Sequence, residues 1–86
     1  MKGVDIALTH VAEGDVLFHN GLWGGPAGFV WADPDGTAAG RVPQWEGEVL
    51  MLAERRGWVA IGRGIGSHDA PVAVTDAGRA VLGRVA

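Results

Sequence analysis

The chain has 86 residues, a formal net charge of −3, 48% hydrophobic residues and no cysteine. Without cysteine, a disulfide-stabilised scaffold and a thiolate metal site are excluded. There is no apolar run of the length that crosses a membrane and no secretory signal at the start, so we expect a cytoplasmic protein. We expect residues 1–86 to form a single globular domain, too short to enclose a large active site.

The N-terminal segment predicts a short helix followed by a strand. Its apolar residues recur at helical spacing: Val4, Ala7, Leu8 and Val11. Such a stripe is typical of one buried helix face. Gly14 follows the last turn, where glycine commonly ends a helix. The next segment, 15–19, is a short apolar run that ends before Asn-Gly, and it predicts a strand.

A glycine- and proline-rich stretch and a hairpin are predicted next. Residues 21–28 contain four glycines and one proline, a composition that excludes a regular helix and favours a loop. The runs 29–32 and 37–41 flank the sequence Asp-Pro-Asp-Gly. Proline presets the second position of a tight turn and glycine supplies a left-handed position. The two runs are therefore expected to pair as an antiparallel hairpin.

The next helix is predicted to run from position 44 to position 56. Its core side is expected to carry Trp45, Val49, Leu52 and Ala53. A neighbouring, more exposed side is expected to carry Gln44, Glu48, Met51 and Arg55. Both sides follow the helical period. Gly57 comes directly after two arginines, an order that is typical of a helix C-terminus.

The C-terminal third predicts two strands, a glycine-rich connection and a final helix. Residues 58–61 and 71–74 are short apolar runs on either side of the glycine-rich segment 62–70. Thr75 is a suitable N-cap for a helix that has Asp76 in its first turn. In chain order the prediction is α-β-β-β-α-β-β-α, which is an α+β fold.

Two motifs in this part of the chain resemble a known family. The first is Leu-Ala-Glu-Arg-Arg-Gly-Trp-Val at 52–59, and the second is Val-Ala-Val-Thr-Asp-Ala-Gly-Arg-Ala-Val-Leu at 72–82. Together they look like the helix, wing and closing helix of a winged-helix domain, over about residues 45–83. The resemblance is to small winged-helix proteins of actinobacteria and their phages. It implies a winged-helix-like fold in which residues 62–70 form the wing.

The sequence departs from the family pattern before the wing. A complete winged helix has two helices, the helix-turn-helix, between its first strand and the wing. Here the region 20–43 is rich in glycine and proline and predicts a hairpin, so only the helix at 44–56 precedes the wing. The helix-turn-helix is therefore expected to be degenerate, and the resemblance supports the fold better than it supports DNA reading.

Large apolar side chains are the candidates for a protein interface. Of the four tryptophans, Trp45 and Trp58 are expected in the core. Trp23 in the loop, Trp31 on the hairpin and Met51 on the helix are the candidate partner-binding residues, because a large exposed apolar side chain is a good anchor. They would bind a protein partner or a second copy of the chain. The alternative is that both Trp23 and Trp31 pack on the core.

A DNA-binding alternative uses the helix at 44–56 as a recognition helix. The residues it would use are Gln44, Glu48, Arg55 and Arg56 on the helix, with Arg63 and His68 in the wing. Glutamine can pair with adenine, and glutamate can accept from cytosine N4. The carboxylates of Glu46 and Glu48 and the net charge of −3 oppose contact with phosphates. A solvated helix face is therefore the competing interpretation.

The histidines, the Ser-His-Asp sequence and the glycine pattern do not predict a metal site, a catalytic triad or a nucleotide-binding site. The three histidines, His10, His19 and His68, share no metal-ligand spacing. Residues 67–69 place Ser, His and Asp side by side, whereas a catalytic triad converges from separate elements. The glycine pattern of the predicted wing leads into a strand and not into a helix, unlike a nucleotide-binding fingerprint. We therefore expect no enzyme activity, metal, cofactor or small-molecule substrate.

The first functional hypothesis is accordingly a small non-catalytic macromolecule-binding protein, an adaptor for protein–protein interaction. The chain is rich in Ala, Gly and Val, and six of its seven basic residues are Arg, a composition typical of high-GC bacteria and their phages. A phage protein that binds a host factor in the host cytoplasm fits this composition. The second hypothesis is a DNA-binding transcription regulator that uses the helix at 44–56 and the wing at 62–70.

Overall fold

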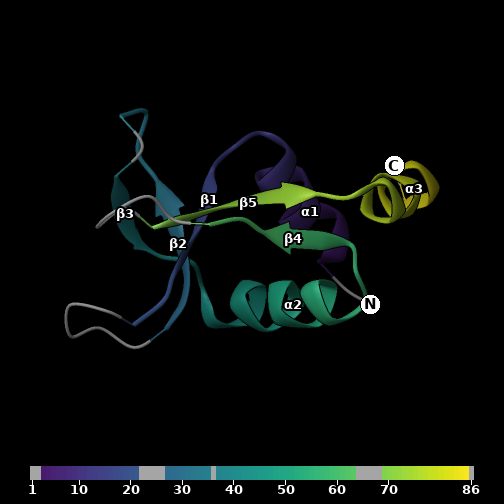
Figure 1. The fold of residues 1–86 in the computed structure, drawn as a ribbon. Coiled ribbons are helices and arrows are strands. Elements are labelled where there is room, and N and C mark those ends of the chain that lie inside the picture. The colour runs from purple at the N-terminus through teal and green to yellow at the C-terminus, as the bar shows by residue number, and fades with distance from the viewer. Residues whose placement is uncertain (1–2, 22–26, 36, 64–68, 86) are drawn as a thin grey trace.

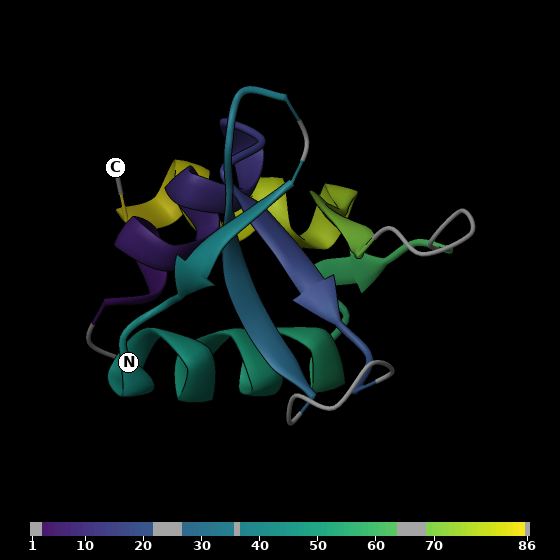
Figure 2. The same ribbon diagram turned by 90° about the vertical axis from the view of Figure 1, so that its left-hand side faces the viewer.

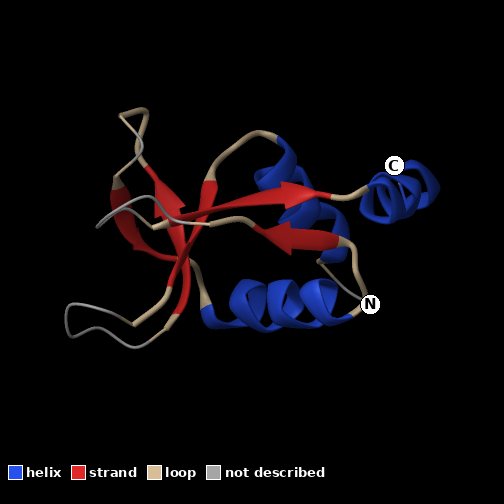
Figure 3. Ribbon diagram, viewed as in Figure 1, coloured by secondary structure: helices blue, strands red, loops and turns tan. Residues whose placement is uncertain are grey.

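The computed structural model describes residues 3–21, 27–35, 37–63 and 69–85, and it shows three helices and five strands in these ranges (Figure 1). In chain order the elements are α1 (Val4–Ala12), β1 (Val16–His19), β2 (Gly28–Ala32), β3 (Ala38–Arg41), α2 (Gln44–Arg55), β4 (Val59–Ile61), β5 (Ala70–Val74) and α3 (Asp76–Val85). Figure 3 shows the strands at the centre of the molecule, with α2 running beside them and α3 at one end.

The five strands form one antiparallel sheet in the order β3-β2-β1-β5-β4. The central strand is β1, in which Val16 lies opposite Trp31 of β2 and Leu17 lies opposite Pro71 of β5. The hairpin of β2 and β3 therefore lies on one side of β1 (Figure 2), and the hairpin of β4 and β5 lies on the other. The molecule is a small α+β fold.

One face of the sheet packs against α1 and α2. Along β5, Val72 and Val74 are buried whereas Pro71 and Ala73 are exposed, because successive side chains point to opposite faces of a strand. The buried face and the helices share a single apolar core. The helix α1 contributes the predicted stripe to this core, and all four residues are buried: Val4, Ala7, Leu8 and Val11. This part of the prediction is confirmed.

Three local signals for turns and caps are also confirmed. Gly57, directly after α2, has a φ of 76°, the left-handed conformation expected of a residue that ends a helix. The hydroxyl oxygen of Thr75 accepts a hydrogen bond of 3.1 Å from the Gly78 N–H and so caps α3. In the hairpin of β2 and β3, the Asp33 N–H donates a hydrogen bond of 2.7 Å to the Thr37 carbonyl. The glycine of that turn, position 36, lies outside the described residues.

The helix α2 is present where it is predicted, and its core side is partly the predicted one: Ala53 is buried and Val49 packs against the core, whereas Trp45 does not. Its buried residues are Glu46, Leu50 and Ala53. Trp45 is 44% exposed and packs across Gly3, where an added Cβ would lie 2.5 Å from the ring atom Cζ3. The prediction that Trp45 is a core residue is therefore wrong, whereas Trp58 is partly buried against the core. The packing of α1 on α2 determines which residues of α2 face the core, because it places Glu46 against His10.

Candidate functional site

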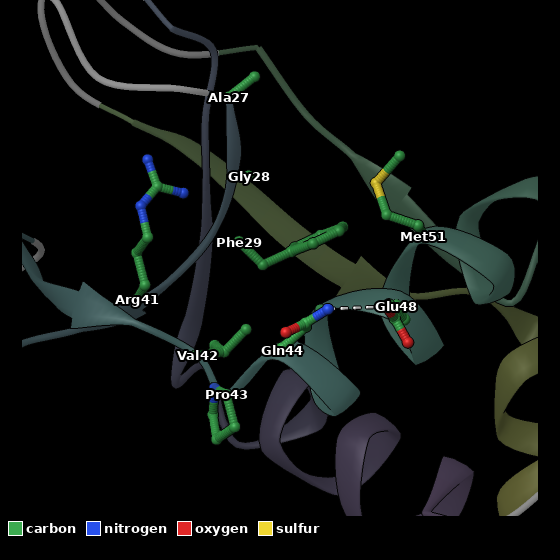
Figure 4. Close-up of a pocket in the computed structure, with 10 residues that line it drawn as sticks. Ala27, Gly28, Phe29, Arg41, Val42, Pro43, Gln44, Glu48 and Met51 are labelled. Carbon is green, nitrogen blue, oxygen red and sulfur yellow. Dashed lines mark hydrogen bonds between the residues drawn. The ribbon is translucent and has the colours of Figure 1, made fainter.

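A groove with a volume of about 450 Å³ lies between the start of β2 and the first half of α2 (Figure 4). Its floor is apolar and includes Phe29 and Val42, which are both buried. Its rim carries exposed side chains from the end of β3 and from α2: Arg41, Gln44, Glu48 and Met51. The ring of Phe29 points toward the helix that carries Met51. An apolar concave surface with a few polar groups around it is the usual form of a binding site.

The groove exists because β2 and β3 separate at this end of their hairpin. Val30 lies opposite Arg41 in the ladder. The next contact is a long hydrogen bond of 3.4 Å, which the Val42 N–H donates to the Phe29 carbonyl. Pro43 then adopts a φ of −56° and a ψ of 152° as the N-cap of α2. Since proline has no N–H that could continue the ladder, the chain leaves the β2 edge, and α2 forms the opposite wall.

The rim of the groove carries charges of both signs. The guanidinium of Arg41 lies across Gly28 of β2, where an added Cβ would lie 2.7 Å from its Nη1 atom. On the helix, Nε2 of Gln44 donates a hydrogen bond of 3.3 Å to Oε1 of Glu48. Met51 follows one turn later and is 45% exposed. A partner in the groove would therefore meet an apolar floor, a large apolar side chain and two charges of opposite sign.

The three predicted partner-binding residues have different positions. Met51 stands exposed on the rim of the groove, as its predicted position on α2 requires. Trp31 is partly buried against the core, and its ring meets the ring of His10 edge to face with centroids 5.0 Å apart. The expectation that Trp31 is an exposed anchor is therefore corrected: the alternative, packing on the core, describes it. Trp23 lies outside the described residues.

The residues of the DNA-binding alternative are spread over a wide surface. Gln44 and Glu48 line the groove at the beginning of α2. Arg55 and Arg56 are exposed at the C-terminal end of the helix, about 16 Å along its axis from Gln44 and about 10 Å from Glu48. The Arg56 guanidinium lies 5.3 Å from the centre of the Trp58 ring. Arg63 is exposed after β4, and position 68 lies outside the described residues. The structure thus groups the acidic end of α2 with Met51 and Arg41, and the arginines of the DNA-binding alternative lie further away.

The buried pair of Glu46 and His10 has no counterpart among the sequence predictions. The Glu46 side chain is 1% exposed, and its Oε2 atom accepts a hydrogen bond of 2.9 Å from Nδ1 of His10. A glutamate in the first turn of a helix predicts a solvated side chain, and 36 positions separate the two residues. No local signal could therefore indicate this pair.

A second histidine pair joins the end of β1 to the start of β5. Nδ1 of His19 lies 2.9 Å from Oδ1 of Asp69, and both side chains are partly buried.

No group of three or more histidine and carboxylate side chains with the arrangement of a metal site occurs within the described ranges. In the same part of the chain, each helix is too short or too polar to cross a membrane.

Comparison with protein-family models, with curated proteins and with solved structures found no significant match for this chain.

Proposed function

We propose that this protein is a non-catalytic protein-interaction module and that it binds a partner protein through the groove between β2 and α2. The observation that carries the proposal is the position of Met51, a large apolar side chain that is exposed above an apolar floor. Exposed anchors of this kind, surrounded by polar groups, contribute most of the binding energy at protein interfaces. Methionine also adapts its shape to different partner surfaces.

The size and composition of the groove support this proposal. Its volume of about 450 Å³ falls within the range of about 300–1,000 Å³ that is usual for small-ligand pockets, so it can take only a small part of a partner protein. Phe29 and Val42 give it an apolar floor that would receive a side chain of the partner. Arg41 and Glu48 on the rim would orient the partner without a large cost of desolvation, because both are exposed.

We also propose a winged-helix-like arrangement for the part of the fold that follows the groove. The helix α2 is followed by the hairpin of β4 and β5, and β5 pairs with β1. This arrangement supports a comparison with a recognition helix, a wing and the first strand of that family. The hairpin of β2 and β3 stands between β1 and α2, where the family has a helix. In this proposal the hairpin replaces that helix and creates the groove.

Photo-crosslinking tests the proposed function. A photoreactive residue placed at position 51 in the full-length chain is expected to crosslink one specific partner in cells. The matched control is the same residue at position 6, because Ile6 is 48% exposed and lies on α1 outside the groove. Met51→Glu should weaken binding to the purified partner by about tenfold or more, whereas Ile6→Glu should leave it unchanged. No crosslink from position 51, or equal crosslinks from both positions, would overturn the proposal.

The same experiment separates the proposal from its alternatives. A crosslink between two copies of the chain would assign the groove to a homodimer. A crosslink to nucleic acid, together with salt-dependent DNA binding, would favour the regulator hypothesis with Gln44, Glu48 and the arginines of α2. Either outcome would replace the proposed partner protein.

A further inference from the structure

Met51 carries the only sulfur atom among the described residues. The sequence has two methionines and no cysteine, and the other methionine, at position 1, lies outside the described residues. Thiols and thioethers are the side-chain groups that peroxides oxidise reversibly. Because this chain has no thiol, such chemistry depends on its thioethers and on how well the folded protein exposes them.

Met51 is accessible to a small oxidant in the folded protein. It is one of the most exposed large apolar residues, and Figure 4 shows its side chain at the α2 side of the groove. Its neighbour Leu50 is fully buried, and its other neighbour Leu52 is half-buried. Since the oxidation of methionine follows its exposure, peroxide can react with Met51 without any opening of the core.

Oxidation of Met51 would change the groove and leave the core intact. The core side chains of α2 lie on the other side of the helix and include Leu50 and Ala53. A sulfoxide at position 51 is hydrated in the free protein. In a complex, the same polar group would have to leave water and enter an apolar contact above Phe29 and Val42. Burial of a polar group without a hydrogen-bond partner costs free energy, so the oxidised groove binds more weakly.

We infer that Met51 is a reversible oxidation site and that peroxide prevents binding of the partner protein to the groove by converting this thioether to the sulfoxide. The site follows from exposure and sulfur chemistry. Its consequence for binding rests on the proposed function, because only a partner that covers Met51 would respond to the added oxygen atom.

The oxidation step is a transfer of one oxygen atom from hydrogen peroxide. A lone pair of the sulfur attacks one oxygen of the peroxide, so that an S–O bond forms and the O–O bond breaks. The departing hydroxide takes the proton of the S–OH group and becomes water. Sulfur loses two electrons, and the peroxide gains them.

Methionine sulfoxide reductases catalyse the reverse step, with one enzyme for each epimer of the sulfoxide. Two thiol groups supply the two electrons and two protons, form a disulfide and release the oxygen as water. The thioether of Met51 is then restored, which makes the modification reversible.

Peptide mass spectrometry after treatment of the full-length protein with hydrogen peroxide tests the site. Fragment ions separate oxidation of Met51 from oxidation of Trp45 on the same helix. Met51 should be oxidised at no less than about a tenth of its rate in the chain unfolded in urea, because the folded chain exposes it. The treated protein should keep its circular dichroism spectrum, and the two reductases with a thiol reductant should restore its mass. Slower oxidation, or loss of the folded spectrum, would overturn the inference.

Photo-crosslinking from position 44 tests the consequence for binding. Gln44 lines the same groove, so a photoreactive residue there reports on the partner while Met51 stays in place. The purified full-length protein is oxidised, freed of peroxide and mixed with the protein that position 51 crosslinks. The crosslink yield should fall by about tenfold or more, and the reductases should restore it.

Met51→Leu and Met51→Gln are the matched variants for this experiment. Leucine has no thioether, so the yield that Met51→Leu retains should be the same with and without peroxide, although Met1 is still oxidised. Met51→Gln carries a polar group at the same place and should give the low yield without any treatment.

The outcomes separate the oxidation switch from the proposed function. If the untreated protein is crosslinked and the yield is unchanged after Met51 is oxidised, the oxidation switch is wrong and the proposed function stands. An equal fall in the parent chain and in Met51→Leu would assign the effect to another residue and would also overturn the switch. If the untreated protein gives no crosslink from position 44 or from position 51, the proposed function is wrong, and its regulation at Met51 is wrong with it.

Discussion

The carboxyl group of Glu46 is the least expected residue-level feature of the molecule. It is almost completely buried at the contact of α1 and α2, and its partner His10 is 33% exposed. Burial of a charged group is costly unless hydrogen bonds compensate for it. The bond between Nδ1 of His10 and Oε2 of Glu46 supplies this compensation and fixes how the two helices meet.

Removal of His10 tests the importance of this bond. His10→Ala should lower the free energy of unfolding by about 1–3 kcal/mol, because the buried carboxylate loses its partner. Glu46→Leu should cost less, since an apolar side chain of similar size leaves no buried charge. The measurement is urea unfolding followed by circular dichroism. The control Glu48→Ala, at an exposed position, should remain within about 0.5 kcal/mol of the parent. Equal stability of His10→Ala and the control would contradict the role of the pair.

The pKa of Asp35 reports on the hydrogen bonds in the turn between β2 and β3. The Thr37 hydroxyl donates a hydrogen bond to its carboxylate at 2.7 Å, and the Thr37 N–H donates another at 3.0 Å. These bonds lower the pKa of Asp35 below its ordinary value of 3.8, the hydroxyl contributing most. They stabilise the charged form, so they favour the folded hairpin above the ordinary pKa, and this contribution disappears as the pH falls through the lowered pKa.

Thr37 variants separate the hydroxyl from the rest of the turn. Thr37→Ala should raise the pKa of Asp35 toward its ordinary value, whereas Thr37→Ser keeps a hydroxyl and should keep the pKa low. NMR titration of the Asp35 side-chain carbon gives both values. The same pKa in Thr37→Ala and in the parent chain would mean that the hydroxyl bond does not form in solution.

At the level of elements, α3 is held against the hairpin of β4 and β5 by a close backbone contact. A Cβ on Gly78 would overlap the Trp58 carbonyl oxygen and would lie 2.7 Å from Cγ1 of Val74. The first turn of α3 therefore approaches the strands more closely than any residue with a side chain permits. This contact and the Thr75 cap place α3 directly after β5.

Two glycines of the same helix provide a matched test. Gly78→Ala should destabilise the protein by about 1–3 kcal/mol, because α3 must move away from the backbone of Trp58. Gly83→Ala should stabilise it by up to about 1 kcal/mol, because no atom lies within 4 Å of the added Cβ and alanine favours a helix. Thermal unfolding compares both variants with the parent. Equal and small effects would show that α3 is not docked in this way.

For the whole molecule, the distribution of charge bears on the choice of partner. The net charge is −3, and Glu48 lies on the half of α2 that a recognition helix would insert into the major groove. The arginines at the other end of the helix include Arg56, which stacks on Trp58. This arrangement supports the proposed protein partner over a polyanion.

A DNA titration tests this conclusion. At about 50 mM salt, where phosphate contacts are strong, the full-length protein at micromolar concentration should not change the anisotropy of a labelled random duplex. Binding that weakens with salt, and that loses about one unit of salt dependence in Arg63→Ala, would support the regulator hypothesis instead.

The sequence by itself determined the features that depend on neighbouring residues. The apolar stripe of α1, the turn after Ala32, the left-handed Gly57 and the Thr75 cap all follow from local spacing and local backbone preference. It also indicated that Met51 lies on an exposed side of α2. These predictions need no knowledge of what the elements pack against.

Only the tertiary structure decided which residues of α2 face inward and where the groove lies. The sequence pattern placed Trp45 in the core and Glu46 outside, because hydrophobicity is counted residue by residue. In the structure Glu46 is buried and Trp45 is exposed, because His10, far away in the sequence, forms a hydrogen bond with the carboxyl group of Glu46. The groove likewise depends on distant segments, since Phe29 and Met51 line it together only because β3 turns into α2. Contacts between segments, and not the composition of any one of them, create both features.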